Sequence, residues 1–139
     1  MNKFKLDIDY DYDFVLIGIS CHETDYRICW AINNELGFDF KRTDDLEIKD
    51  KKLTTFSTYS LYAYHNDKTY MDYYIIENRS DDRLLIPEQK QTDFFMVIKG
   101  NILPTEKEEL VKKLKNISFV LAVYEIDPNQ LKSKQNLLF

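Results

Sequence analysis

The stretch that decides the fold runs from residue 86 to residue 100 and has the sequence Ile86-Pro87-Glu88-Gln89-Lys90-Gln91-Thr92-Asp93-Phe94-Phe95-Met96-Val97-Ile98-Lys99-Gly100. Pro87 fixes its own φ angle, lacks a backbone N–H and biases Ile86 towards an extended conformation. From Thr92 to Ile98 most residues are β-branched or aromatic, which favours a strand that is covered on both faces. The stretch therefore predicts a rigid corner that leads into a central strand.

The segments before this corner predict a hairpin and a helix. Residues 54–64 and 68–78 are rich in Thr, Tyr and Ile, and the polar residues 65–68 between them suit a turn. We therefore expect these segments to form two paired strands. Nearer the start of the chain, Ser20 opens a sequence of capping-box form, which predicts a helix from Ser20 to Gly37.

Two helices are expected, and they differ in the apolar surface that they present. In the first helix, Tyr26 and Trp30 should widen an apolar face that recurs at helical spacing. The second helix begins with a capping box at Thr105 and has a narrow apolar stripe, so only one side should be buried. The apolar positions are Ile28, Ile32 and Leu36 in the first helix and Leu110, Val111 and Leu114 in the second.

Four further segments complete the predicted fold. Residues 3–14 alternate between apolar and charged side chains, which predicts a half-exposed strand. Residues 38–42 predict a short strand, residues 43–52 a charged loop or a short turn of helix, and residues 119–126 a final strand. The fold class is therefore α+β, with a mainly antiparallel β-sheet and two α-helices packed on one face. The whole of residues 1–139 is expected to form a single globular domain, with a C-terminal tail from about residue 128.

The composition restricts the class of protein. The chain has a net charge of −5 and contains ten Tyr, nine Phe and one Trp, but only three Gly. This acidic balance argues against non-specific binding to nucleic acid or to an anionic membrane. The sequence shows no signal peptide and no long apolar run, and it has two cysteines, so we expect a cytoplasmic protein.

The corner also carries a family resemblance. Ile86-Pro87-Glu88, three further residues and then Thr92-Asp93-Phe94 resemble the motif that names the IPExxxVDY family of small bacterial proteins. Thr92 stands where that motif has Val, and Phe94 stands where it has Tyr. Ile17-Gly18-Ile19, residues 26–33 and the tail at 131–139 resemble the family as well, so the likeness covers essentially the whole chain. It implies a bacterial, cytoplasmic protein and brings no catalytic residue with it.

Glu88 and Asp93 bracket the corner, and their carboxylates have two interpretations. A rigidly held pair could act as acid and base if burial raised the pKa of one of them. Alternatively, each carboxylate accepts hydrogen bonds and locks the corner. Because no Gly-rich loop and no Ser/His/Asp set accompanies them, we expect a structural or interaction role for the motif and no catalytic residue. The motif residues are Ile86, Pro87, Glu88, Asp93 and Phe94.

Cys21 is the candidate nucleophile, because the first turn of a helix would stabilise its thiolate. Adjacent helical residues point in different directions, however, so His22 would be badly placed to act as its base. Cys29, two turns later, indicates instead that both thiols are packed in the core. Together with His65, these residues lack the spacing of a zinc site, and we predict no metal and no cofactor.

Aromatic residues of the hairpin and the apolar end of the chain form the candidate interface. Tyrosines on a sheet can stack on bases, anchor a protein interface or be covered by the protein's own helices. We rank covering by the helices first and base stacking last, because Lys68 is the one cation of the hairpin. The candidate interface residues are Tyr62, Tyr64, Tyr73, Leu137, Leu138 and Phe139.

Two functions from different classes follow from these observations. The first is a non-enzymatic protein-interaction or self-associating module, whose partner is a protein or a second copy of the chain. The alternative is an RNA-associated accessory protein, and an enzyme with a Glu88/Asp93 acid–base pair comes third. The basic residues that would contact RNA are Lys112, Lys113, Lys115, Lys132 and Lys134.

Overall fold

Strand β9 (Phe94–Lys99) lies at the centre of the molecule, as the corner stretch predicts. It pairs antiparallel with β1 (Val15–Cys21) on one side and with β6 (Met71–Glu77) on the other. Phe94 to Ile98 are at most 1% exposed, so the prediction of a strand covered on both faces is confirmed. This computed structural model describes residues 14–49, 55–81 and 83–139, and most of the strand predicted over residues 3–14 lies outside these ranges.

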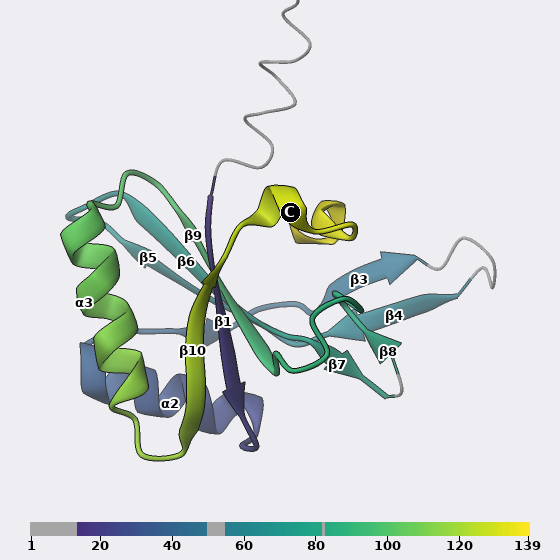
Figure 1. The fold of residues 1–139 in the computed structure, drawn as a ribbon, viewed down its shortest axis with the longest axis horizontal. Helices are drawn as coiled ribbons and strands as arrows, with labels where there is room; N and C mark the ends of the chain where they lie inside the picture. The colour runs from purple at the N-terminus through teal and green to yellow at the C-terminus, as the bar shows by residue number, and fades with distance from the viewer. Residues whose placement is uncertain (1–13, 50–54, 82) are drawn as a thin grey trace, which may run out of the picture.

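The main sheet has six strands in the order β10-β1-β9-β6-β5-β2, and its described pairs are all antiparallel. The predicted hairpin is present in part, as β5 (Leu61–Asn66) and β6, which pair from Leu61 with Ile76 to Asn66 with Met71. The strand predicted over residues 54–64 is divided, because residues 56–59 form a separate strand that does not pair with β6, and residue 54 lies outside the described ranges. The two ends of the sheet are β10 (Val120–Ile126) and β2 (Lys41–Arg42). Together with the two helices, this sheet confirms the α+β class (Figure 1).

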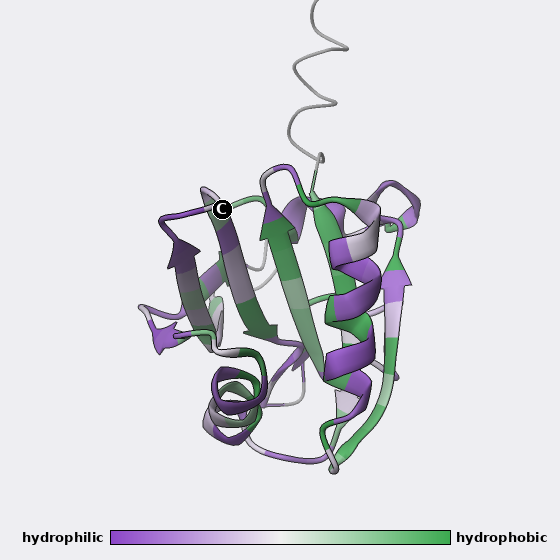
Figure 2. Cartoon of the chain, turned by 90° about the vertical axis from the view of Figure 1, so that its left-hand side faces the viewer, coloured by the Kyte–Doolittle hydropathy of each residue, from purple (hydrophilic) through white to green (hydrophobic). Residues whose placement is uncertain are grey.

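Both described helices pack on the same face of the sheet. Helix α2 (Asp25–Leu36) buries Ile28 and Ile32, and α3 (Pro104–Lys115) buries Leu110 and Leu114. These side chains share one core with inward-facing residues of the strands, which are Ile17, Ile19, Cys21, Ile75, Met96, Ile98 and Val123. Figure 2 looks onto this face and shows α3 in front of the strongly apolar strands, with α2 seen end-on at the lower left.

The opposite face is covered by two small two-stranded sheets and by the C-terminal tail. Strands β3 (Leu46–Lys49) and β4 (Phe56–Tyr59) pair with each other, as do β7 (Arg79–Ser80) and β8 (Arg83–Leu84). The tail forms two 3₁₀ turns, η1 (Pro128–Gln130) and η2 (Lys134–Leu137). The second core under this cover contains Leu16, Tyr59, Ile76, Leu85, Ile86, Phe95, Val97, Ile126, Leu131 and Leu137.

Several predicted boundaries are wrong. The first helix begins at Asp25 rather than at Ser20, because the hydrogen bonds of β1 extend to Cys21 and outweigh the capping sequence. Tyr26 and Trp30 are 66% and 62% exposed, so they do not widen its buried face. The second helix begins at Pro104, one residue before the predicted capping box at Thr105. The side chain of Glu106, rather than that of Glu108, accepts the capping hydrogen bond, which comes from the backbone N–H of Leu103.

Two further predictions for the first half of the chain need correction. Residues 43–52 were expected to be a charged loop, yet Leu46–Lys49 forms strand β3, because Leu46 and Ile48 pack against the second core. Only Lys41–Arg42 of the predicted strand over residues 38–42 pairs with the sheet. Gly37 ends the first helix as expected, at a φ of 71° in the left-handed region that glycine tolerates best.

Gly18 is required by the close approach of β10 rather than by its backbone angles. A Cβ atom at this position would lie 2.5 Å from Cε2 of Tyr124 and 2.9 Å from Cδ1 of Ile126. Tyr124 is the register partner of Gly18, so its ring lies directly over the glycine. The missing side chain therefore provides the space in which the Tyr124 ring packs.

We predict that Gly18→Ala lowers the free energy of unfolding by about 1–3 kcal/mol, because overpacking forces the Tyr124 ring or the strand to move. Urea unfolding measures this change. The Tyr124→Ala variant removes most of the clash. In this background, Gly18→Ala should lower the free energy of unfolding by a clearly smaller amount. Equal costs in the two backgrounds would show that Tyr124 is not the reason for the glycine.

Candidate functional site

The corner is organised by Asn78, which directly follows β6 and is completely buried. Its side-chain oxygen accepts a hydrogen bond from the backbone N–H of Ile86 at 2.8 Å. Its Nδ2 donates to the carbonyl oxygens of Gln89 and Thr92 at 3.0 and 2.8 Å. The Asn78 backbone adds two bonds, from its N–H to the Asp93 carbonyl and from the Leu85 N–H to its own carbonyl. One buried residue thus holds both ends of the corner.

Asp93 joins the corner to the end of β1. Its Oδ2 accepts a hydrogen bond from the backbone N–H of Cys21 at 2.9 Å, and its Oδ1 lies 3.7 Å from Nε of Arg79. The backbone N–H of Asp93 donates to the Ile19 carbonyl. The carboxylate therefore satisfies a backbone group where the pairing of β1 becomes irregular, between Ser20 and Cys21.

Glu88 points in another direction and holds the tail. Its two carboxylate oxygens accept hydrogen bonds from the backbone N–H and the hydroxyl of Ser133, at 2.7 and 3.0 Å. Burial is the largest single influence on this carboxyl and opposes its ionisation. The hydrogen bonds from Ser133, together with those from the backbone of Glu88 itself and of Lys132, outweigh burial, so the pKa of Glu88 lies below its usual range. Asn136 adds a second attachment of the tail by donating to the carbonyl of Leu85 at 2.9 Å.

The remaining motif positions build the core. Ile86 is fully buried, and Phe94 is 1% exposed within the core beneath the helices. Thr92, where the family motif has Val, is also buried, and its hydroxyl lies 2.6 Å from the Tyr124 hydroxyl. The Tyr124 hydroxyl in turn lies 3.1 Å from Oγ of Ser20, so a chain of hydroxyls ties the corner to β1 and β10.

The two carboxylates of the motif therefore bind different groups. Asp93 satisfies the Cys21 N–H and approaches Arg79, whereas Glu88 binds Ser133 in the tail. A hollow of about 400 Å³ lies beside Glu88, next to Tyr124, Glu125 and Asp127. Asp93 does not line it, so the hollow does not bring the predicted acid–base pair together. This geometry favours the locking role of the motif.

The candidate nucleophile is not at a helix N-terminus. Cys21 ends β1 and is 1% exposed, and burial raises the pKa of its thiol, with a smaller contribution from the charge of Asp93. Burial likewise raises the pKa of Cys29, which lies in the same core. Among the described residues, no group of three or more His, Cys, Asp and Glu side chains is placed to hold a metal ion.

The hairpin tyrosines are largely covered by the protein itself. Tyr62 and Tyr73 are 7% and 8% exposed, and Tyr64 packs half-buried beside Tyr73 with ring centroids 5.6 Å apart. Phe38 lies 4.9 Å from the Tyr64 ring and 4.7 Å from the Tyr73 ring. Tyr62 and Tyr73 therefore expose too little surface to anchor a protein interface, in line with the covering by the protein itself that we rank first.

The apolar end of the chain is divided between core and surface. Leu137 is completely buried in the second core, so it cannot contact a partner in the folded chain. Leu138 and Phe139 are 38% and 39% exposed. Phe139 packs edge-on against Tyr74, and Nζ of Lys99 donates to its carbonyl oxygen at 2.7 Å. The tail is thus mainly a cover for the sheet.

The two edges of the sheet differ strongly, which the sequence did not indicate. At one end, β2 has two paired residues, and both are exposed and charged. At the other end, β10 has seven residues, and no strand within the described ranges pairs with its outer side. Leu121 of β10 is 64% exposed, and Ala122 beside it is exposed too. A hollow of about 380 Å³ adjoins this edge, lined by Lys115, Val120, Leu121, Ala122 and Val123.

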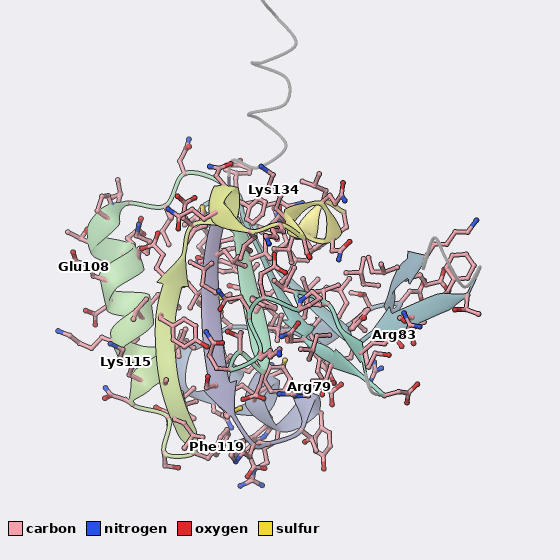
Figure 3. The ribbon with its side chains drawn as sticks, turned by 45° about the vertical axis from the view of Figure 1, so that its right-hand side comes forward. Arg79, Arg83, Glu108, Lys115, Phe119 and Lys134 are labelled. Atoms are coloured by element: carbon pink, nitrogen blue, oxygen red, sulfur yellow. The ribbon has the colours of Figure 1, made fainter. Side chains whose placement is uncertain are left out.

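The basic residues proposed to contact RNA come from two separate parts of the molecule. Lys112, Lys113 and Lys115 belong to the end of α3, whereas Lys132 and Lys134 belong to the tail. Figure 3 shows Lys115 and Lys134 well apart, on opposite ends of β10. No helix in the described part of the chain has the length and apolarity needed to cross a membrane.

We predict that Asn78→Ala lowers the free energy of unfolding by about 2–4 kcal/mol, because buried backbone groups of the corner lose their partners. Asn78→Asp should also destabilise the protein, since a carboxylate cannot donate to two carbonyl oxygens. Chemical denaturation measures both effects, with the exposed Asn101→Ala as the matched control. A cost for Asn78→Ala no larger than that of the control contradicts the central role of Asn78.

We predict that Glu88→Gln weakens attachment of the tail and costs about 0.5–1.5 kcal/mol at neutral pH. Because the folded-state pKa of Glu88 lies below its unfolded value, its contribution is present above the unfolded pKa and disappears as the pH falls through the folded pKa. The stability difference from the wild type should therefore shrink in acid. Amide hydrogen exchange of residues 128–137 reports the loosened tail, and Glu108→Gln on the exposed side of α3 is the control. Unchanged exchange in the tail would rule out this role.

Comparisons of the chain with protein-family models, with curated proteins and with solved structures give no match in any of the three.

Proposed function

We propose that the chain is a non-enzymatic, self-associating module whose copies pair through the free edge of β10. The observation that supports this proposal is the apolar character of that edge. Leu121 is 64% exposed on a seven-residue strand at the end of the sheet. An edge strand presents unpaired backbone N–H and C=O groups, which another strand can satisfy.

The opposite edge supports the same argument by contrast. Natural sheets protect their edges with short strands and charged side chains, particularly lysine. Strand β2 has both features, in Lys41 and Arg42, and Arg42 is further held by Asp25 and Asp45 at 3.3 and 2.9 Å. Strand β10 is longer, and Glu125 near its end is its one charged residue. Within the described ranges, the sheet is therefore protected at the β2 edge and less protected at the β10 edge around Leu121.

A second copy of the chain suits β10 better than an unrelated strand because the charges at its two ends are opposite. Lys115 borders the beginning of the strand, whereas Asp127 and Glu125 lie near its end, where Glu125 also pairs with Lys107 of its own chain at 3.0 Å. A twofold axis makes two identical edge strands antiparallel, which brings the beginning of one strand to the end of the other. The cation of each copy would then approach the carboxylates of its partner, and the two sheets would join into one.

The biological setting is part of the proposal. The resemblance of the corner to the IPExxxVDY motif supports membership of that bacterial family, and the net charge of −5 and two buried thiols suit the cytoplasm. The RNA-associated alternative has weaker support, because its lysines come from two separate elements, of which Lys115 and Lys134 lie well apart. The acid–base alternative has the weakest support, because Glu88 and Asp93 bind different partners.

We predict that the wild-type chain dimerises as its concentration rises and that Leu121→Lys shifts this equilibrium towards the monomer. A charge placed on the edge must be desolvated, or repelled by its copy, when two strands pair. Sedimentation velocity or light scattering across micromolar to millimolar concentrations measures the change.

The matched control is Leu103→Lys, which makes the same substitution at a leucine that is 60% exposed at the start of α3. This variant should dimerise as the wild type does. A wild type that stays monomeric throughout the range, or equal loss of the dimer in both variants, would count against pairing through β10.

A further inference from the structure

A groove of about 460 Å³ lies between the two helices and the sheet, and it shares no lining residue with the hollow beside β10. Its volume falls within the range of small-molecule sites, roughly 300–1,000 Å³. The apolar lining comes from the end of α2, the loop after it, β6, the segment before α3 and α3 itself. These residues are Leu36, Phe38, Tyr73, Ile102 and Leu110.

The aromatic wall of the groove is held in place before any ligand binds. Asn33 of α2 accepts a hydrogen bond from the backbone N–H of Phe40 at 2.8 Å and donates to its carbonyl at 3.2 Å. These two bonds fix the short segment that carries Phe38. The Phe38 ring then packs 4.7 Å from the Tyr73 ring, which belongs to the rigid hairpin. A preformed wall lowers the entropic cost of binding.

The polar part of the groove lining carries more negative than positive charge. Glu106 and Glu109 of α3 line the groove together with one cation, Lys113, and with Thr105. Glu106 is itself positioned, because its Oε1 accepts a hydrogen bond from the backbone N–H of Leu103 at 3.0 Å. Burial raises the pKa of Tyr73, and the charge of Glu106 adds to this effect, so the field of the carboxylate extends to the phenol that lines the groove.

We propose that this groove binds a small organic cation that has an apolar body, of the class of aromatic or branched primary amines. The ammonium group would lie beside Glu106 and Glu109, and the apolar body would pack between Phe38, Tyr73 and Leu110. Both parts of the groove favour such a ligand. The carboxylates attract its positive charge, and the aromatic and aliphatic lining suits its apolar body.

The charge of the ligand can be tested with two probes of similar size and shape. Phenethylamine is a cation at neutral pH, and 3-phenylpropanoate is its anionic counterpart. In ¹H–¹⁵N correlation spectra of the full chain, phenethylamine should shift the amide signals of residues lining the groove in a saturable way, and the anion should bind several-fold more weakly. Equal binding of the two probes, or no saturable shift with phenethylamine up to its solubility limit, would overturn the proposal.

Two variants locate the site. Glu109→Gln should weaken phenethylamine binding by roughly two- to fivefold, the effect of one exposed ion pair. Glu108→Gln makes the same change at the adjacent position of α3, which does not line the groove, and should leave the affinity unchanged. Phe38→Leu keeps an apolar wall but removes the ring, and should also weaken the amine. Equal affinities for Glu109→Gln and Glu108→Gln would contradict this location.

Neither the groove nor these variants involve the edge of β10. Dimerisation measured by light scattering should therefore be the same for Glu109→Gln and for the wild type. A chain that fails to dimerise can still bind the amine, and a chain that fails to bind the amine can still dimerise, so the two proposals fail separately.

Discussion

The cover on the second face of the sheet depends on one buried amide, that of Asn78. A buried polar group that loses its partner destabilises the fold by about 1–3 kcal/mol. Conformations of the corner that break the hydrogen bonds of Asn78 are therefore disfavoured. Because Asn78 directly follows β6 and binds the backbone of residues 86–92, the corner continues the pairing of β6 with β9. The corner is therefore as firmly placed as the sheet, although it has little regular structure.

The tail extends the same arrangement. Glu88 binds Ser133, and Asn136 binds the carbonyl of Leu85, so the tail is attached to the corner at two points while Leu131 and Leu137 complete the second core. The polar residues that make the corner conspicuous in the sequence are consequently engaged in holding this cover. The two binding surfaces that we propose, the edge of β10 and the groove between the helices and the sheet, lie outside this cover.

Helix α3 links the two proposed binding surfaces. It supplies Lys115 to the hollow beside β10, whereas Glu106 and Glu109 line the groove towards α2. The two surfaces differ in chemistry, because one offers backbone hydrogen bonds and exposed aliphatic side chains, and the other offers aromatic rings and carboxylates. A strand suits the first surface, and a small cation with an apolar body suits the second.

The sequence by itself determined the α+β class, the central strand, the hairpin and the end of the first helix at Gly37, because hydrophobic period and glycine conformation act locally. Tertiary structure decided what depends on distant partners. Ser20 stayed in β1 because its pairing with β10 outweighed a capping sequence, and Asn78, the last residue of a predicted strand, became the buried centre of the corner. The sequence likewise did not indicate that β10 ends the described sheet. An apolar strand has a similar sequence in the middle and at the end of a sheet, and its position depends on the arrangement of the other strands.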